Sequence, residues 1–67
     1  MIQLSLRDRE IMRLVAKGLA NKQIALGLEP PCREETVKGH LKAIYLKLGV
    51  KNRAEATAEW IRSGEGE

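Results

Sequence analysis

The chain has 67 residues, a formal net charge of +3 and one cysteine, Cys32. A single cysteine excludes an internal disulfide and a cysteine-rich zinc site, so Cys32 is interpreted as a small apolar filler in a turn. No apolar run approaches the roughly 20 residues of a membrane span, and no signal peptide is visible. We therefore expect one cytoplasmic domain over residues 1–67, with its core at about residues 4–64, and we expect no cofactor and no metal. A chain this short buries only about 60% of its unfolded surface, so helix packing has to stabilise it, with dimerisation as a further source.

The first half of the chain predicts two helices. Ser5 can cap a helix over about residues 6–17, and Asp8, three residues on, makes a shortened capping box with it. Gly18 ends this helix. A short second helix is predicted over residues 21–28, and its start lacks a capping serine.

Two further helices follow a proline-rich connection. Residues 29–32 read E-P-P-C and cannot continue a helix, because each proline removes a backbone donor. The third helix is predicted from about 33–35 to Leu48, where Gly49 follows. Asn52 can cap a fourth helix over about residues 53–63. No run alternates with a period of two, so no strand is predicted.

The third predicted helix has two chemically different sides. At about 100° per residue, Lys38 and Lys42 lie one turn apart on a flank shared with Gly39. Four apolar residues form a narrow stripe on another side: Val37, Leu41, Ile44 and Leu48. A helix with one side for a core and another side for an anion indicates a nucleic-acid partner. The alternative is a solvated basic surface.

The charge distribution follows the same segment. Residues 33–53 carry six lysines and arginines against two acidic residues, a local +4. Residues 54–67 carry four glutamates against one arginine, a local −3. The positive charge is therefore concentrated on the third helix and the turn after it.

Three motifs in this order resemble the LuxR-type helix-turn-helix domain, which also occurs at the C-terminus of NarL/FixJ-type response regulators. They are N-K-x-I-A from Asn21, T-V-K-x-H from Thr36 and K-L-x-V-x-x-R from Lys47. The resemblance implies an all-α, compact four-helix domain with a helix-turn-helix formed by helices 2 and 3. It also implies that the third helix enters the DNA major groove and that the fourth pairs two copies.

Carried over by position, the resemblance implies base or backbone contacts for Lys38 and Lys42, and phosphate contacts near Lys22 and Thr36. It places His40 at the helix–DNA boundary. With Lys47 added to the positive field, the expected DNA-binding residues are Lys22, Thr36, Lys38, Gly39, His40, Lys42 and Lys47. The resemblance also implies an ion pair between Glu10 of helix 1 and Arg53 of helix 4.

The sequence departs from the family pattern in three places. The connection between helices 2 and 3 is two residues longer and contains Pro30-Pro31. Cys32-Arg33 replaces the apolar-serine step before the third helix, which removes a capping serine. Gly39 stands where a base-reading side chain is common, and we interpret it as weakened base discrimination, with close backbone approach to bases as the alternative.

The fourth predicted helix carries a stripe with two interpretations. Ala56, Thr57 and Trp60 either complete the core or form a dimer patch, and the sequence does not decide between them. Under the second interpretation, all three are dimerisation residues.

The sequence therefore predicts a bacterial transcription regulator that binds double-stranded DNA selectively as a homodimer, at the nucleoid when bound. No nucleophile–base pair, carboxylate pair or glycine-rich phosphate loop is present, so we expect no enzyme activity. No part of the 67 residues can sense a signal. We therefore expect either a fragment of a larger regulator, with a receiver or sensor domain as a further partner, or a small standalone regulator. The alternative function is a protein-interaction module of the same fold that pairs with a full-length regulator and blocks its DNA binding.

Overall fold

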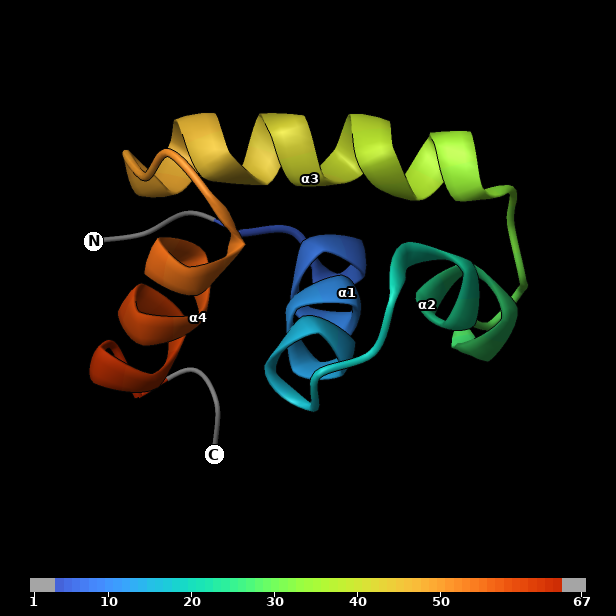
Figure 1. Cartoon of the computed structure of the whole chain (residues 1–67), viewed down its shortest axis with the longest axis horizontal. Helices are drawn as coiled ribbons and strands as arrows, with labels where there is room; N and C mark the ends of the chain where they lie inside the picture. Colours follow the sequence, from blue (N-terminus) through green and yellow to red (C-terminus); the bar gives the residue numbers. More distant parts are fainter. Residues whose placement is uncertain (1–3, 65–67) are drawn as a thin grey trace.

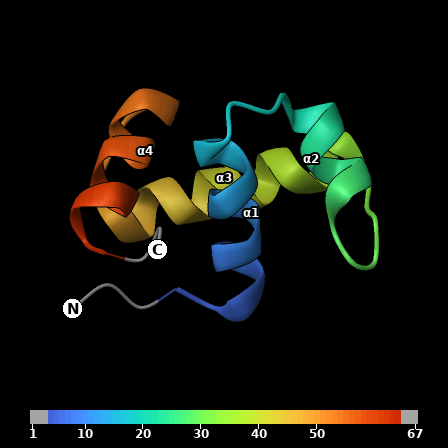
Figure 2. The ribbon, with the colours of Figure 1, turned by 90° about the horizontal axis from the view of Figure 1, so that it is seen from below.

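The computed structural model of the chain describes residues 4–64, which fold into four helices (Figure 1). In chain order they are α1 (Leu6–Ala16), α2 (Asn21–Gly27), α3 (Glu34–Leu48) and α4 (Arg53–Arg62). The longest helix, α3, lies across the other three, and α1 lies between α2 and α4 in both ribbon views (Figures 1 and 2). The expected all-α, four-helix fold is confirmed, and the predicted helix ends lie within one or two residues of those observed.

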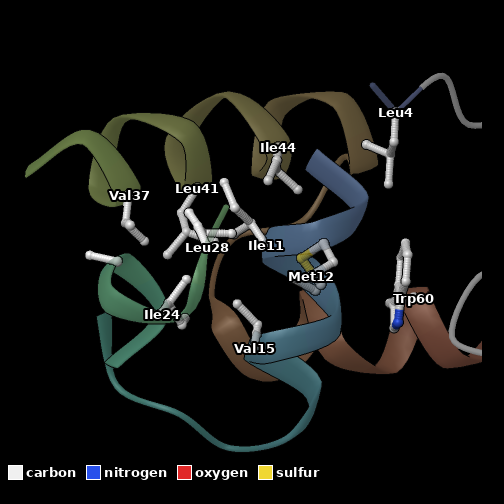
Figure 3. Packing of buried hydrophobic residues seen from close by; sticks show 12 residues of the cluster. Leu4, Ile11, Met12, Val15, Ile24, Leu28, Val37, Leu41, Ile44 and Trp60 are labelled. Carbon is white, nitrogen blue, oxygen red and sulfur yellow. The ribbon is translucent and has the colours of Figure 1, made fainter. Parts of the chain in front are cut away.

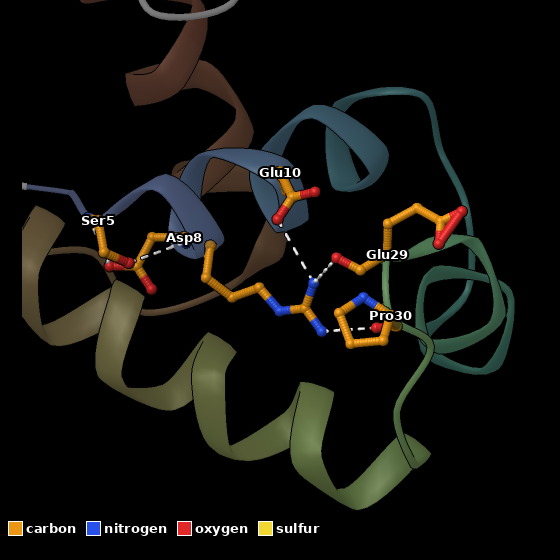
Figure 4. Close-up of polar contacts among 6 residues, drawn as sticks. Ser5, Asp8, Glu10, Glu29 and Pro30 are labelled. Carbon is orange, nitrogen blue, oxygen red and sulfur yellow. Dashed lines mark hydrogen bonds and ion pairs between the residues drawn. The ribbon is translucent and has the colours of Figure 1, made fainter.

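The first helix begins with the predicted capping box. The Asp8 N–H donates to Ser5 Oγ at 3.0 Å, and the Ser5 N–H donates back to Asp8 Oδ2 at 3.1 Å (Figure 4). These bonds satisfy two backbone donors that the helix itself leaves free. At the other end of the chain, the Glu55 N–H donates to Asn52 Oδ1 at 2.9 Å, which confirms the cap of α4.

Glycine ends α3 by a conformation that other residues adopt at a cost. Gly49 has a φ of 70° and lies in the left-handed region. Its N–H returns to the Leu46 carbonyl at 3.3 Å, and the Val50 N–H returns to the Tyr45 carbonyl at 3.0 Å. These bonds satisfy carbonyls at the end of α3 and turn the chain toward α4.

The start of α2 has only half of a capping arrangement. Ala20 occupies the cap position and offers no side-chain acceptor. Its N–H donates to Gln23 Oε1 at 2.8 Å. The Asn21 side chain does not supply the missing cap, because its oxygen accepts a hydrogen bond from Arg53.

The core lies where α3 crosses the other helices. Val37, Leu41 and Ile44 point from α3 toward side chains of α1 and α2 (Figure 3). The buried apolar residues are Leu4, Ile11, Met12, Val15, Ile24, Ala25, Leu28, Val37, Leu41, Ile44, Ala56 and Trp60. Leu48, the fourth member of the predicted stripe, is only partly buried at the edge of this cluster.

The contribution of α4 to the core decides the question that the sequence left open. Ala56 is 0% exposed and Trp60 is 1% exposed within one chain. Both residues therefore complete the core, and the expectation that they form a dimer patch is corrected, since a side chain packed inside one copy has no surface left for another. Thr57, the third residue of that stripe, is half-buried.

Between residues 4 and 64, no helix is long and apolar enough to cross a membrane. The same stretch holds no group of three or more His, Cys, Asp or Glu side chains that could bind a metal ion.

Candidate nucleic-acid interface

The outer side of α3 is not covered by another helix (Figure 1). Lys38 and Lys42 lie on this side, both exposed. The structure gives neither side chain a hydrogen bond or an ion pair with any other residue from 4 to 64. Residues four apart on a helix have Cβ atoms about 5–6 Å from each other, so the two ammonium groups can reach one groove or two adjacent phosphates. The structure thus leaves both charges available to a ligand.

A groove of about 440 Å³ opens beside these two lysines, between α3 and the starts of α2 and α4. Its lining residues are Asn21, Lys38, Leu41, Lys42, Tyr45 and Arg53. Three of them are cationic and none carries a carboxylate, so the groove has a positive potential that favours an anion. Asn21 and Tyr45 were missed as site residues, because their proximity to the lysines depends on how the helices cross.

Arg53 connects the start of α4 to the start of α2. Its guanidinium donates to the Leu19 carbonyl at 3.1 Å and to Asn21 Oδ1. Glu10 is paired instead with Arg7, at 3.4 Å. The expected Glu10–Arg53 ion pair is therefore wrong, because Arg53 is directed at the connection between α1 and α2.

Gly39 lies between the two lysines in the sequence and is exposed. A Cβ atom built at Gly39 would meet nothing within 4 Å, so packing does not require glycine here. The position therefore presents only backbone to a ligand, in line with a weakened readout of bases.

The other predicted residues of α3 lie on its opposite flank. Thr36 is exposed in the first turn, and His40 is half-buried one turn later. Lys47 follows on the same side at about 100° per residue. Its Nζ lies 2.6 Å from Asp8 Oδ2, so the ammonium is engaged by α1. Lys47 was expected to add to the positive field at the DNA, and the structure shows that its ammonium has a partner within the domain.

The surroundings of the Asp8 carboxylate favour its charged form. Its residue is only 3% exposed, and burial by itself raises the pKa. The hydrogen bonds from the Lys47 ammonium and with Ser5 outweigh burial and hold the pKa of Asp8 below its ordinary value. The ion pair between Asp8 and Lys47 therefore stabilises the folded domain, because it joins the start of α1 to the end of α3.

Lys22 is the predicted site residue outside α3. It is exposed at the second position of α2, next to the groove residue Asn21. The exposed lysines of the candidate interface therefore come from both helices of the helix-turn-helix, Lys22 from α2 and Lys38 and Lys42 from α3. Contact of these residues, and of Thr36 and His40, with DNA stays a prediction.

Comparison with known proteins gives a consistent result. Residues 2–59 match the family described as bacterial regulatory proteins, luxR family. The chain is 41% identical over 66 residues to the probable HTH-type transcriptional regulator GfsR of Streptomyces halstedii. It is 46% identical over 59 residues to the nitrate/nitrite response regulator protein NarL of Escherichia coli. These alignments cover 98% and 88% of this chain but 26% of each relative, so the chain spans about a quarter of their length.

A shorter relative matches over most of its length. The spore germination protein GerE of Bacillus subtilis is 39% identical over 62 residues, which cover 92% of this chain and 81% of that protein. A solved structure described as that of the transcription factor GerE superposes with a TM-score of 0.82 at 37% identity. The superposition covers 92% of this chain and 90% of the other.

Proposed function

This chain belongs to the luxR family of bacterial regulatory proteins, and on that basis we propose that it binds double-stranded DNA selectively with α3 in the major groove. The family consists of DNA-binding transcription regulators and not of enzymes. The observation that carries the proposal is the pair of exposed lysines, Lys38 and Lys42, which have no partner within the described chain.

Phosphate contacts supply most of the affinity in this proposal. A lysine ammonium is a compact point charge that suits a phosphate, whereas arginine is the better bidentate reader of guanine. Gly39 adds no side chain to the outer side of α3. We therefore expect affinity from lysine–phosphate contacts at Lys22, Lys38 and Lys42, and modest selectivity from a few groove contacts.

We place the homodimer contact on the outward side of α4. Ala54, Ala58 and Ile61 are exposed at positions that share one side of the helix, and Ile61 keeps 64% of its surface. Two copies joined in this way would read half-sites about one helical turn apart. Sedimentation tests the contact: Ile61→Lys should shift the monomer–dimer equilibrium toward monomer. The control Leu26→Lys, at an exposed position of α2, should leave the equilibrium unchanged. The contact is contradicted if Ile61→Lys shifts the equilibrium no more than the control does.

The chain would act in the cytoplasm, at the nucleoid, as the DNA-binding part of a regulator. The curated relatives GfsR and NarL are about four times longer than the region they share with this chain. That length difference supports a receiver or sensor domain as a further partner.

Selection of oligonucleotides from a random double-stranded pool at two salt concentrations tests the proposed function. We expect recovery of a related set of sequences at low salt and loss of most binding at high salt. Recovery of unrelated sequences contradicts selectivity. An absence of bound DNA, together with a tight complex with a full-length regulator, favours the interaction module instead.

A further inference from the structure

The guanidinium of Arg7 holds the connection between α2 and α3. Arg7 is the second residue of α1, and its side chain is 26% exposed. One terminal nitrogen donates to the Glu29 carbonyl at 3.1 Å, and the other donates to the Pro30 carbonyl at 2.8 Å (Figure 4). The Glu10 carboxylate, 3.4 Å away, orients the same guanidinium from the next turn of α1.

The connection has few other polar contacts that fix it. Pro30 and Pro31 have no N–H, so this stretch cannot satisfy its own carbonyls by regular turns. The Cys32 N–H donates to the Ala25 carbonyl at 3.0 Å, which holds the far side of the connection. Arg33, at the cap position of α3, makes no side-chain capping bond. The start of α3 is therefore held by the connection and by the burial of Val37.

We propose that Arg7 is a positioning residue for DNA reading: by fixing the longer, proline-containing connection, it sets the orientation of α3 against α2. This inference rests on the proposed function, since orientation matters because Lys22 on α2 and Lys38 and Lys42 on α3 must meet one DNA duplex together. A rotation of α3 would leave every lysine charged and exposed but would misalign the groups that read the bases.

The chemistry of the contact requires arginine. A guanidinium presents N–H groups in a planar fork and can donate to two neighbouring carbonyls at once. A lysine keeps the positive charge but presents a single flexible ammonium. Arg7→Lys therefore removes the geometry of the contact and keeps its charge, which separates positioning from electrostatic attraction.

The test compares Arg7→Lys with Arg13→Lys in the full chain. Arg13 lies on the same helix, and its exposed side chain has no hydrogen bond or ion pair with the rest of residues 4–64. Two quantities are measured: hydrogen exchange of the Cys32 amide, and the ratio of affinities for a selected oligonucleotide and its scrambled version. We expect Arg7→Lys to exchange about tenfold faster at Cys32 and to lower the ratio about fivefold, with affinity for scrambled DNA unchanged. Arg13→Lys should change neither quantity.

The two readouts make failure specific. If the Cys32 amide of Arg7→Lys exchanges at the wild-type rate, Arg7 does not fix the connection between α2 and α3. Faster exchange with an unchanged affinity ratio overturns the link to DNA reading, and so does an equal loss for selected and scrambled DNA. A wild-type chain that binds no DNA contradicts the proposed function and with it this inference, whereas the exchange of Cys32 then still reports whether Arg7 holds the connection. Glu10→Gln, which leaves both carbonyl bonds in place, should give a smaller change of the same sign in both quantities, and a larger one contradicts the assignment to the carbonyl contacts.

Discussion

Lysines on the same helix have different surroundings in this domain. Lys47, near the end of α3, places its ammonium 2.6 Å from the buried Asp8 carboxylate. Lys38 and Lys42, on the outer side of α3, have no partner within the described chain. The difference shows that positive charge on a helix is not by itself a ligand site. Whether the fold brings a partner to a lysine decides whether its charge stabilises the domain or remains available to a ligand.

Asp8→Ala should give the largest loss of stability among the changes that test this comparison. It removes an acceptor of the capping box and leaves Lys47 without its partner. We expect a loss of about 2 kcal/mol in the free energy of unfolding, measured by urea denaturation. A loss of less than about 0.5 kcal/mol, as for an ordinary surface change, contradicts the structural role.

Lowering the pH should remove part of the same contribution. The pKa of Asp8 is lower in the folded chain than in the unfolded one, so its stabilisation is complete above the unfolded pKa of about 4 and is lost as pH falls through the folded pKa. We expect the difference in unfolding free energy between wild type and Asp8→Asn to shrink between pH 5 and strongly acidic conditions, roughly pH 2. A constant difference across this window would be inconsistent with the ion pair.

Lys47→Ala should lower the stability of the domain. Its effect on DNA affinity should be only the small loss expected when a charge distant from the DNA is removed. The side chain of Lys47 is 43% exposed, so solvent weakens the pair and we expect a loss of about 1 kcal/mol. The slope of log affinity against log salt concentration should stay at its wild-type value. A slope that becomes shallower by about one would instead assign Lys47 a phosphate contact.

Gly39→Ala should produce the smallest change, and its sign is opposite. The added Cβ meets no atom within 4 Å, and alanine favours the helix over glycine. We expect a gain of roughly 0.8 kcal/mol in the free energy of unfolding, measured by thermal melting. If the gain is accompanied by a large loss of DNA affinity, Gly39 serves close approach to the bases, and weakened readout is wrong.

The helix boundaries could be predicted because their signals are local. Ser5 with Asp8, Gly49 and Asn52 act within a few residues of themselves, and the structure confirms each at its predicted place. The start of α2 offered no such local signal, and the Asn21 side-chain oxygen there accepts from Arg53, a donor 32 residues away in the sequence. Local patterns cannot show a partner of this kind.

The exposure of the candidate site residues was predictable to the same extent. The one-turn spacing of Lys38 and Lys42 is a property of the helix itself, and their exposure follows from the apolar stripe that includes Val37. The pairing of Lys47 with Asp8 spans 39 residues, and the contacts of Arg7 span 22 and 23. These depend on the crossing of helices, which neither periodicity nor the family motifs specify.

The salt dependence of DNA binding tests the central claim most directly. Wild type, Lys38→Ala, Lys42→Ala and Lys47→Ala are compared on one selected oligonucleotide over a range of salt concentrations. The account predicts that the slope becomes shallower by about one for Lys38→Ala and for Lys42→Ala, and that it stays unchanged for Lys47→Ala. Equal slopes for all four proteins would contradict the assignment of the outer side of α3 to DNA.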